Sequence, residues 1–280
     1  MPLHQLIEVK EGCEATGRKL PVARMTYQRF FRRYQRLSGM SGTVKEVARE
    51  MWSVYRLPVV VVPPNRPLRR TRCRDQIHLT AESKWRTIAE RIEALHRQGR
   101  PVLLGTRSVA TSERASQHLS QAGIAHRVLN AAQDKDEAEI IAVAGEAGRV
   151  TIATNMAGRG TDIKLGTGVA DKGGLHVILS ERHDARRIDR QLEGGCGRQG
   201  DPGSVGVILS FEDPLLEVVH NDLAGKLVAL LSRLIGGRLR MTVFNLAQSK
   251  AERIHSRMRR DLLKSDRKLG DMLAFSGKME

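Results

Sequence analysis

Two glycine-rich stretches hold residue types that could bind phosphate. The first, "ATNMAGRGTDIKLG" (153–166), follows a β-branched run and sets an arginine and an aspartate among glycines. Glycine lets backbone N–H groups approach an anion, and a guanidinium donates to phosphate oxygens in a fork geometry. The aspartate could hold a partner arginine or a water. The candidate phosphate-binding residues here are Gly158, Arg159, Gly160 and Asp162.

The second stretch, "RRIDRQLEGGCGRQGDPG" (186–203), is rich in arginine and glutamine. Its cations are suited to neutralising charge that develops on a transferring phosphoryl group. The candidates are Arg186, Arg187 and Arg198, which flank Gln191 and Gln199. The alternative, equally open from spacing, is a pair of glycine-rich turns whose arginines face solvent.

The elements around these stretches alternate between strands and helices. Such alternation predicts an α/β fold, in which a parallel sheet is covered on both faces and ligands bind in loops beyond the carboxyl ends of the strands. The two stretches and "GTRS" (105–108) are predicted to be such loops. The predicted helices cover 81–98, 112–122 and 134–144, and the predicted strands are "PVLLG", "HRVLN", "RVTIAT", "LHVILS" and "VGVILS".

Flanking segments have less regular patterns. Helical spacing of apolar residues predicts helices over 27–37 and 44–55, and a long amphipathic helix over 244–275. "LPVVVVPPNRP" (57–67) predicts a buried strand followed by a proline turn that links two lobes. The arginine run "RPLRRTRCR" (66–74) is predicted to be a solvated segment, with a polyanion contact as the alternative.

Composition limits the class of protein. The formal net charge of +16 favours polyanionic partners, whether nucleic acid, anionic lipid or nucleotide phosphate. The three cysteines form no C-x-x-C pair, which indicates reduced thiols in a cytosolic protein. No apolar signal region follows Met1, and 214–235 carries too many charges for a membrane span, so a soluble protein is expected.

Three stretches of the sequence together resemble the motor of SecA, the preprotein translocase. "TIATNMAGRGTDIKLG" resembles its motif V, "GGLHVILSERHDARRIDRQLEGGCGRQGDPGS" its motif VI region, and "YQRLSGMSGT" its motif III. "PVLLGTRSVATSE" and "LHQLIEVKEG" also match in order. The resemblance runs from about 3 to 213, and continues more weakly through "AQSKAERIHSRMRRDLLKSD".

The resemblance implies RecA-like lobes of the superfamily 2 helicase type, which bind ATP between them and drive unfolded preprotein through the SecYEG channel. Residues 1–64 would be the end of lobe one, 65–212 lobe two, and 213–280 the start of a helical scaffold. Arg159 and Asp162 would lie near the nucleotide, while Gln191 and Arg198, helped by Arg187, would bind phosphate. The segment containing Gly39 and Thr43 would couple nucleotide state to lobe movement.

The chain departs from that family in two places. It has no G-x-x-x-x-G-K-[ST] and no DExx motif, so ATP and its Mg²⁺ would be held by a lobe that this sequence lacks, and the chain alone is not expected to hydrolyse ATP. The family's Q-L-R-G-R-x-G-R-Q-G reads "QLEGGCGRQG" here, where Glu193 and Gly195 replace arginines. The family uses the arginine aligned with Gly195 as a finger on the γ-phosphate, and Glu193 is expected to repel phosphate.

Several alternatives stay open. The chain could be part of an accessory SecA-like protein, a split subunit that needs a separate lobe-one chain, or a remnant. Rival functions are a non-catalytic scaffold and a nucleic-acid helicase lobe, although few aromatics are present for base stacking. The resemblance implies SecYEG, unfolded preprotein and anionic phospholipid as partners, and a cytoplasmic location at the inner face of the cytoplasmic membrane.

Overall fold

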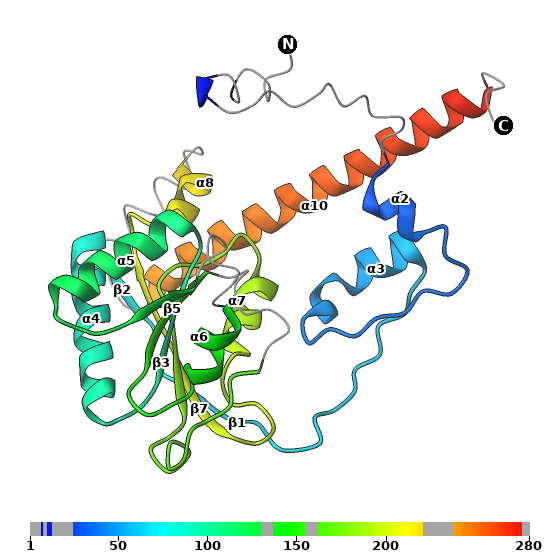
Figure 1. The fold of residues 1–280 in the computed structure, drawn as a ribbon. Helices are drawn as coiled ribbons and strands as arrows, with labels where there is room; N and C mark the ends of the chain where they lie inside the picture. Colours follow the sequence, from blue (N-terminus) through cyan, green and yellow to red (C-terminus); the bar gives the residue numbers. More distant parts are fainter. Residues whose placement is uncertain are drawn as a thin grey trace. The chain divides into compact units, whose positions relative to one another are not determined.

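The computed structural model describes residues 25–129, 137–154, 162–220 and 238–275, together with Ile7 and Lys10–Gly12. The chain forms two compact units, one made of Met1–Leu37 with Arg259–Glu280 and the other of Ser38–Met258. In the first unit, α2 (Tyr27–Phe31) begins at Thr26, whose side chain accepts a hydrogen bond from the Arg29 amide. This helix ends before the predicted Leu37. The second unit holds the sheet (Figure 1).

The sheet is entirely parallel, as the alternating pattern predicts. Its strand order is β1-β7-β6-β3-β5-β4, and β2 pairs with the far end of β7. A fold whose parallel strands are linked by helices is α/β, and this prediction is confirmed. The strands are β1 (Arg69–Arg72), β2 (Gln76–His78), β3 (Val102–Thr106), β4 (Arg127–Leu129), β5 (Val150–Thr154), β6 (Leu175–Leu179) and β7 (Pro202–Ser210).

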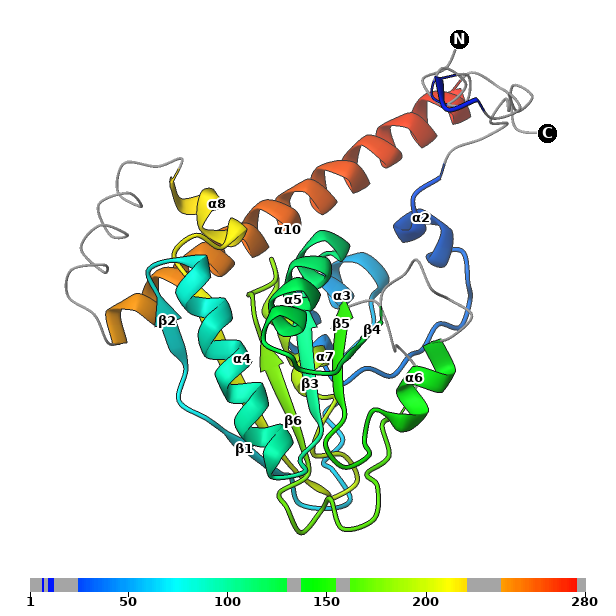
Figure 2. The same cartoon turned by 60° about the vertical axis from the view of Figure 1, so that its left-hand side comes forward.

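Helices cover both faces of the sheet (Figures 1 and 2). On one face, α4 (Ala81–Arg97) and α5 (Val109–Gln121) pack against alternate residues of β3 and β5. On the other face, α6 (Glu137–Val143), α7 (Arg186–Glu193) and the first part of α10 (Arg238–Phe275) pack against the intervening residues. The remaining elements are η1 (Val44–Val47), α3 (Ala48–Tyr55), η2 (Pro214–Leu216) and α8 (Glu217–His220).

Helix α4 illustrates how the sequence sets these elements. Thr80 caps it by accepting from the Ser83 amide, and Gly99 follows it with φ of 68°. Ile88, Ile92 and Leu95, spaced at helical intervals, are buried against the sheet.

Among the described helices, none combines the length and apolar character needed to cross a bilayer.

One prediction about the segment before α4 is wrong. Residues 57–62 form no strand, and Val60, Val61 and Val62 are 78%, 64% and 81% exposed. A buried strand needs a neighbour on each side, and none of the described strands pairs with these residues. The arginine run lies largely in solvent, as predicted, but Arg69–Arg72 forms the edge strand β1 along β7 within it.

Candidate functional site

The turn after α7 carries Arg198. Chain direction places this turn beside the amino end of β7, because the chain leaves the carboxyl end of β6 and re-enters the sheet at Pro202. We expected the whole stretch 186–203 to be a loop beyond the carboxyl ends, but its first half is the helix α7. Because α7 runs back along the sheet, Arg198 lies near the amino ends of the strands and not beyond their carboxyl ends.

Contacts on both sides of its guanidinium hold Arg198. Its Nε donates to the Gly194 carbonyl at 2.7 Å, and its Nη1 pairs with Asp162 Oδ1 at 2.9 Å. Gln199 Nε2 donates to the other Asp162 oxygen at 3.4 Å. The Arg198 and Asp162 side chains are 43% and 37% exposed, so solvent screens the pair and its main effect is on orientation. The result is an oriented arginine that solvent can reach.

Helix α7 also contacts the segment that resembles motif III. Gln191 Nε2 donates to Thr43 Oγ1 at 3.4 Å, and Arg190 forms an ion pair with Glu46. Arg187 lies half-buried on the same helix. The structure thus brings Gln191 and Thr43 together, whereas Gly39 lies exposed in open surroundings.

Arg186 is directed elsewhere. Its amide donates to Glu252 at 2.7 Å and its Nη2 to Ser249 at 2.5 Å, both on α10. This arginine therefore anchors the start of α7 to α10 rather than joining Arg198. Gly158, Arg159 and Gly160 lie outside the described residues, so their candidate roles stay predictions.

Glu193 does not face Arg198. Its side chain is buried, and Arg72 Nη1 pairs with Glu193 Oε1 at 3.0 Å. The expectation that Glu193 repels phosphate is therefore wrong, because an arginine on β1 neutralises the carboxylate. Gly195 lies outside the left-handed region, and a Cβ there would come within 3.0 Å of the Leu192 carbonyl.

Three arginines before and within β1 hold the turn that follows α7; we call them the arginine clamp (Arg66, Arg70 and Arg72). Neither of the two roles predicted for the arginine run included this contact with the turn. The residues alternate along β1, so Arg70 and Arg72 share one face of the strand. The clamp contacts are Arg70 Nη1 to Glu193 O (2.9 Å) and Cys196 O (3.5 Å), Arg72 Nη1 to Glu193 Oε1 (3.0 Å), and Arg66 Nη1 to Gln199 O (3.1 Å).

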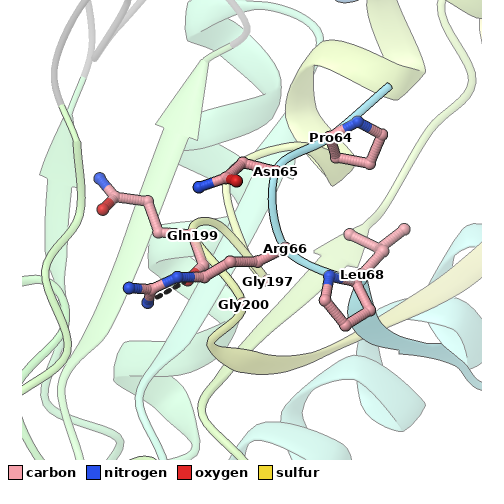
Figure 3. A pocket seen from close by; sticks show the side chains of 8 residues that line it. Pro64, Asn65, Arg66, Leu68, Gly197, Gln199 and Gly200 are labelled. Atoms are coloured by element: carbon pink, nitrogen blue, oxygen red, sulfur yellow. Dashed lines mark hydrogen bonds between the residues drawn. The ribbon is translucent and has the colours of Figure 1, made fainter. Parts of the chain in front are cut away.

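A pocket of about 410 Å³ lies where the segment before β1 crosses this turn (Figure 3). Gln199 has a φ of 52°, an uncommon backbone conformation for a residue other than glycine, and its carbonyl accepts from Arg66. Cys196 in the same turn is buried, and burial raises the pKa of its thiol to about 11. The thiol therefore stays protonated and unreactive at neutral pH.

Sequence reasoning missed the clamp because a charge run usually lies in solvent. The available signal for a strand was the spacing of two residues between Arg70 and Arg72.

No group of three or more potential metal ligands occurs among the described residues.

The parallel sheet, covered on both faces by helices, makes this unit an α/β protein. The model of the SecA P-loop domain matches residues 67–171 and 167–234, and that of the SecA DEAD-like domain matches 2–52. The chain belongs to the SecA family.

Curated relatives agree with this assignment. The chain is 50% identical over 99% of its length to protein translocase subunit SecA 2 of Nitrosospira multiformis, and 50% identical over 99% to SecA 3 of Magnetococcus marinus. It covers 42% and 43% of those two proteins, about two-fifths of their length. The Escherichia coli DEAD-box protein SrmB, solved bound to RraA, aligns with a TM-score of 0.41 and 18% identity, covering 61% of this chain and 88% of SrmB.

Proposed function

We propose that this chain supplies the second lobe of the ATP site of a SecA-like motor for preprotein translocation. The observation that carries the proposal is the Arg198–Asp162 pair, which holds a solvent-accessible guanidinium in one orientation. The contact of Gln191 with Thr43 adds support, because it links α7 to the motif III-like segment.

Within this proposal the residues divide into two roles. Gly158, Arg159, Gly160 and Asp162 bind the nucleotide, and Arg198, with Arg187 and Gln191, stabilises charge on the transferring phosphate. ATP supplies the phosphoryl group, and its Mg²⁺ is held by a first lobe. The described residues suit the lobe-two half of such a site, since they provide fixed cations.

The domain assignment is part of the proposal: 1–64 as the end of lobe one, 65–212 as lobe two and 213–280 as scaffold. The exposed valines at 60–62 support a separate or additional lobe-one segment, because a β-branched run of this kind is suited to pairing in a sheet. In the other unit, α2 and the residues just after it carry exposed aromatic side chains in ring contact: Tyr27, Phe30 and Phe31 on the helix, and Tyr34 beyond it.

The remaining partners follow from the relatives, which carry the name protein translocase subunit. We propose SecYEG, unfolded preprotein and anionic phospholipid, at the inner face of the cytoplasmic membrane. A non-catalytic scaffold is the second candidate, favoured by Glu193 and Gly195 at positions where the family motif has arginines.

Nucleotide titration tests the proposal. A fluorescent ATP analogue with Mg²⁺ should bind the purified chain in the high micromolar range. Arg198→Ala should weaken binding about tenfold, as expected for losing a charge-assisted hydrogen bond to phosphate. The matched control is Arg97→Ala on α4, where the arginine pairs with Glu93. Absence of saturable binding, or equal effects of both substitutions, contradicts the proposal.

A further inference from the structure

The arginine clamp fits closely against the turn that carries Arg198. A Cβ at Gly197 would lie 2.8 Å from the Arg70 Cβ, and one at Gly203 would lie 2.8 Å from the Gly197 amide nitrogen. Such distances leave no room for a side chain at Gly197 or Gly203. The backbone of the turn therefore packs directly against the Arg70 side chain of β1. The turn therefore cannot move without moving β1.

Two of the three clamp arginines contact Glu193: Arg72 pairs with its carboxylate, and Arg70 donates to its backbone carbonyl. The side chain of Arg72 contacts Glu193 through Nη1 and Asp75 through Nη2, at 3.0 Å and 3.3 Å. An arginine in place of Glu193 would face Arg70 and Arg72, and three cations would then share a half-buried site. The glutamate that distinguishes this chain from the family motif is thus matched to the arginines of β1.

Arg198 depends on the same backbone. Its Nε donates to the carbonyl of Gly194, the residue next to Glu193, and its Nη1 reaches Asp162. Fixing an exposed arginine side chain in one orientation costs considerable rotamer entropy. A firm position for the Gly194 carbonyl lowers the number of orientations open to Arg198.

We propose that Glu193 and Arg72 are positioning residues for Arg198. Their ion pair fixes the backbone at 193–194, and this backbone orients the guanidinium toward the side where Asp162 lies. The inference rests on the proposed function for the role of Arg198 in phosphate binding, but the orientation itself is independent of nucleotide.

The first experiment observes Arg198 directly, without nucleotide. The Arg198 Nε–H signal is assigned by its loss in Arg198→Lys, and its hydrogen exchange is measured by NMR in Arg72→Gln and Glu193→Gln. We expect exchange to be about tenfold faster in both, because the Gly194 carbonyl becomes mobile. The control is Arg69→Gln, which removes a cation from the opposite face of β1 and should leave exchange unchanged.

The second experiment measures affinity for the Mg²⁺-bound ATP analogue in the same variants. We expect about fivefold weaker binding in each single variant and no further loss in the double variant, because both substitutions break one ion pair. Arg72→Lys keeps the charge and should lie between wild type and Arg72→Gln.

The outcomes separate the two proposals. If the variants lose stability but Arg198 exchange and nucleotide affinity stay as in wild type, the clamp is only structural and the inference is overturned. If wild type binds no nucleotide, the proposed function fails, and the exchange measurement still decides whether Glu193 and Arg72 position Arg198.

Discussion

At the scale of single residues, His176 is held neutral inside the sheet. Burial, and then the charges of Arg100 and Arg91, lower its pKa from 6.5 to about 3. Its Nδ1 lies 2.6 Å from the Ser204 hydroxyl, which accepts from Arg100 at 2.8 Å. The Ser204 hydroxyl therefore donates a hydrogen bond to the unprotonated His176 Nδ1. A protonated imidazolium could not accept this hydrogen bond.

This leads to a pH-dependent stability. The folded pKa lies below the unfolded one, so stability is complete above about pH 6.5 and falls as pH decreases toward 3, by up to about 1.4 kcal/mol per pH unit. Urea unfolding between pH 4 and 8 measures it. His176→Gln should flatten the profile in this range, since its amide oxygen still accepts from Ser204 and does not titrate. Identical slopes for the variant and wild type would contradict this account.

Gly195 offers a second test at this scale. In the presence of a lobe-one chain, Gly195→Arg should raise ATP turnover with little change in nucleotide affinity, because a finger acts on charge in the transition state. A Cβ here would lie 3.0 Å from the Leu192 carbonyl oxygen and 3.4 Å from the Leu103 side chain, so an added side chain requires these neighbours to shift. Adding Glu193→Arg should reverse the gain, since it breaks the pair with Arg72. Unchanged turnover in Gly195→Arg would mean that Arg198 or Arg187 already fills the role.

At the same scale, residue types predicted two members of the candidate site that lie in contact. Glycine, arginine and aspartate at the right spacing pointed to Arg198 and Asp162, which the structure places in contact. The partners of Glu193 and Arg186 could not be predicted, because Arg72 and Ser249 are far from them in sequence. Long-range pairing of this kind depends on the tertiary fold.

At the scale of elements, a buried network joins α7 to α10. Asp189 accepts from His183 through its amide and ring, from Arg182 at 3.1 Å and from Gln248 at 2.7 Å. Burial alone would raise the pKa of Asp189, but the hydrogen bonds of His183 and Gln248 and the charge of Arg182 outweigh it and hold the pKa below its usual value. The carboxylate therefore stays ionised at neutral pH.

Asp189→Asn should destabilise the Ser38–Met258 unit by about 3 kcal/mol, because it leaves Arg182 without its buried partner and removes an acceptor from the network. Urea unfolding measures this, with Asp184→Asn as a control whose pair with Arg107 is more exposed. The difference should shrink as pH falls through the folded pKa of Asp189, since protonation of wild type removes the same charge. Equal stability of the Asp189 variant and wild type at pH 7 would contradict this account.

The regular elements were predictable where periodicity was strong. Helices α4 and α5, the strands β3 to β7 and the long helix α10 fall close to the predicted ranges. Two of the exceptions are 57–62 and β1. The first has strand composition but no neighbour to pair with, and the second has the composition of a loop but pairs with β7. In both cases the presence or absence of a neighbouring strand, and not the β-propensity of the residues, determined whether a strand forms.

At the scale of the whole molecule, the charge of +16 should direct the chain to anionic membranes. Helix α10 adds exposed apolar side chains on its surface, among them Leu246, Ile254 and Met258. In a flotation assay the chain should rise with vesicles that contain anionic lipid and stay down with neutral ones. Equal flotation with both, together with strong salt-sensitive binding to DNA, would overturn the membrane assignment.

The central claim is that this chain is the second half of an ATP site. The most direct measurement is steady-state ATP turnover by the chain alone, and by the chain mixed with the remaining part of a SecA relative such as that of Nitrosospira multiformis. The account predicts no turnover by the chain alone, turnover above background in the mixture, and loss of that turnover with Arg198→Ala but not with Arg97→Ala. Turnover by the chain alone, or turnover in the mixture that does not depend on Arg198, would contradict it.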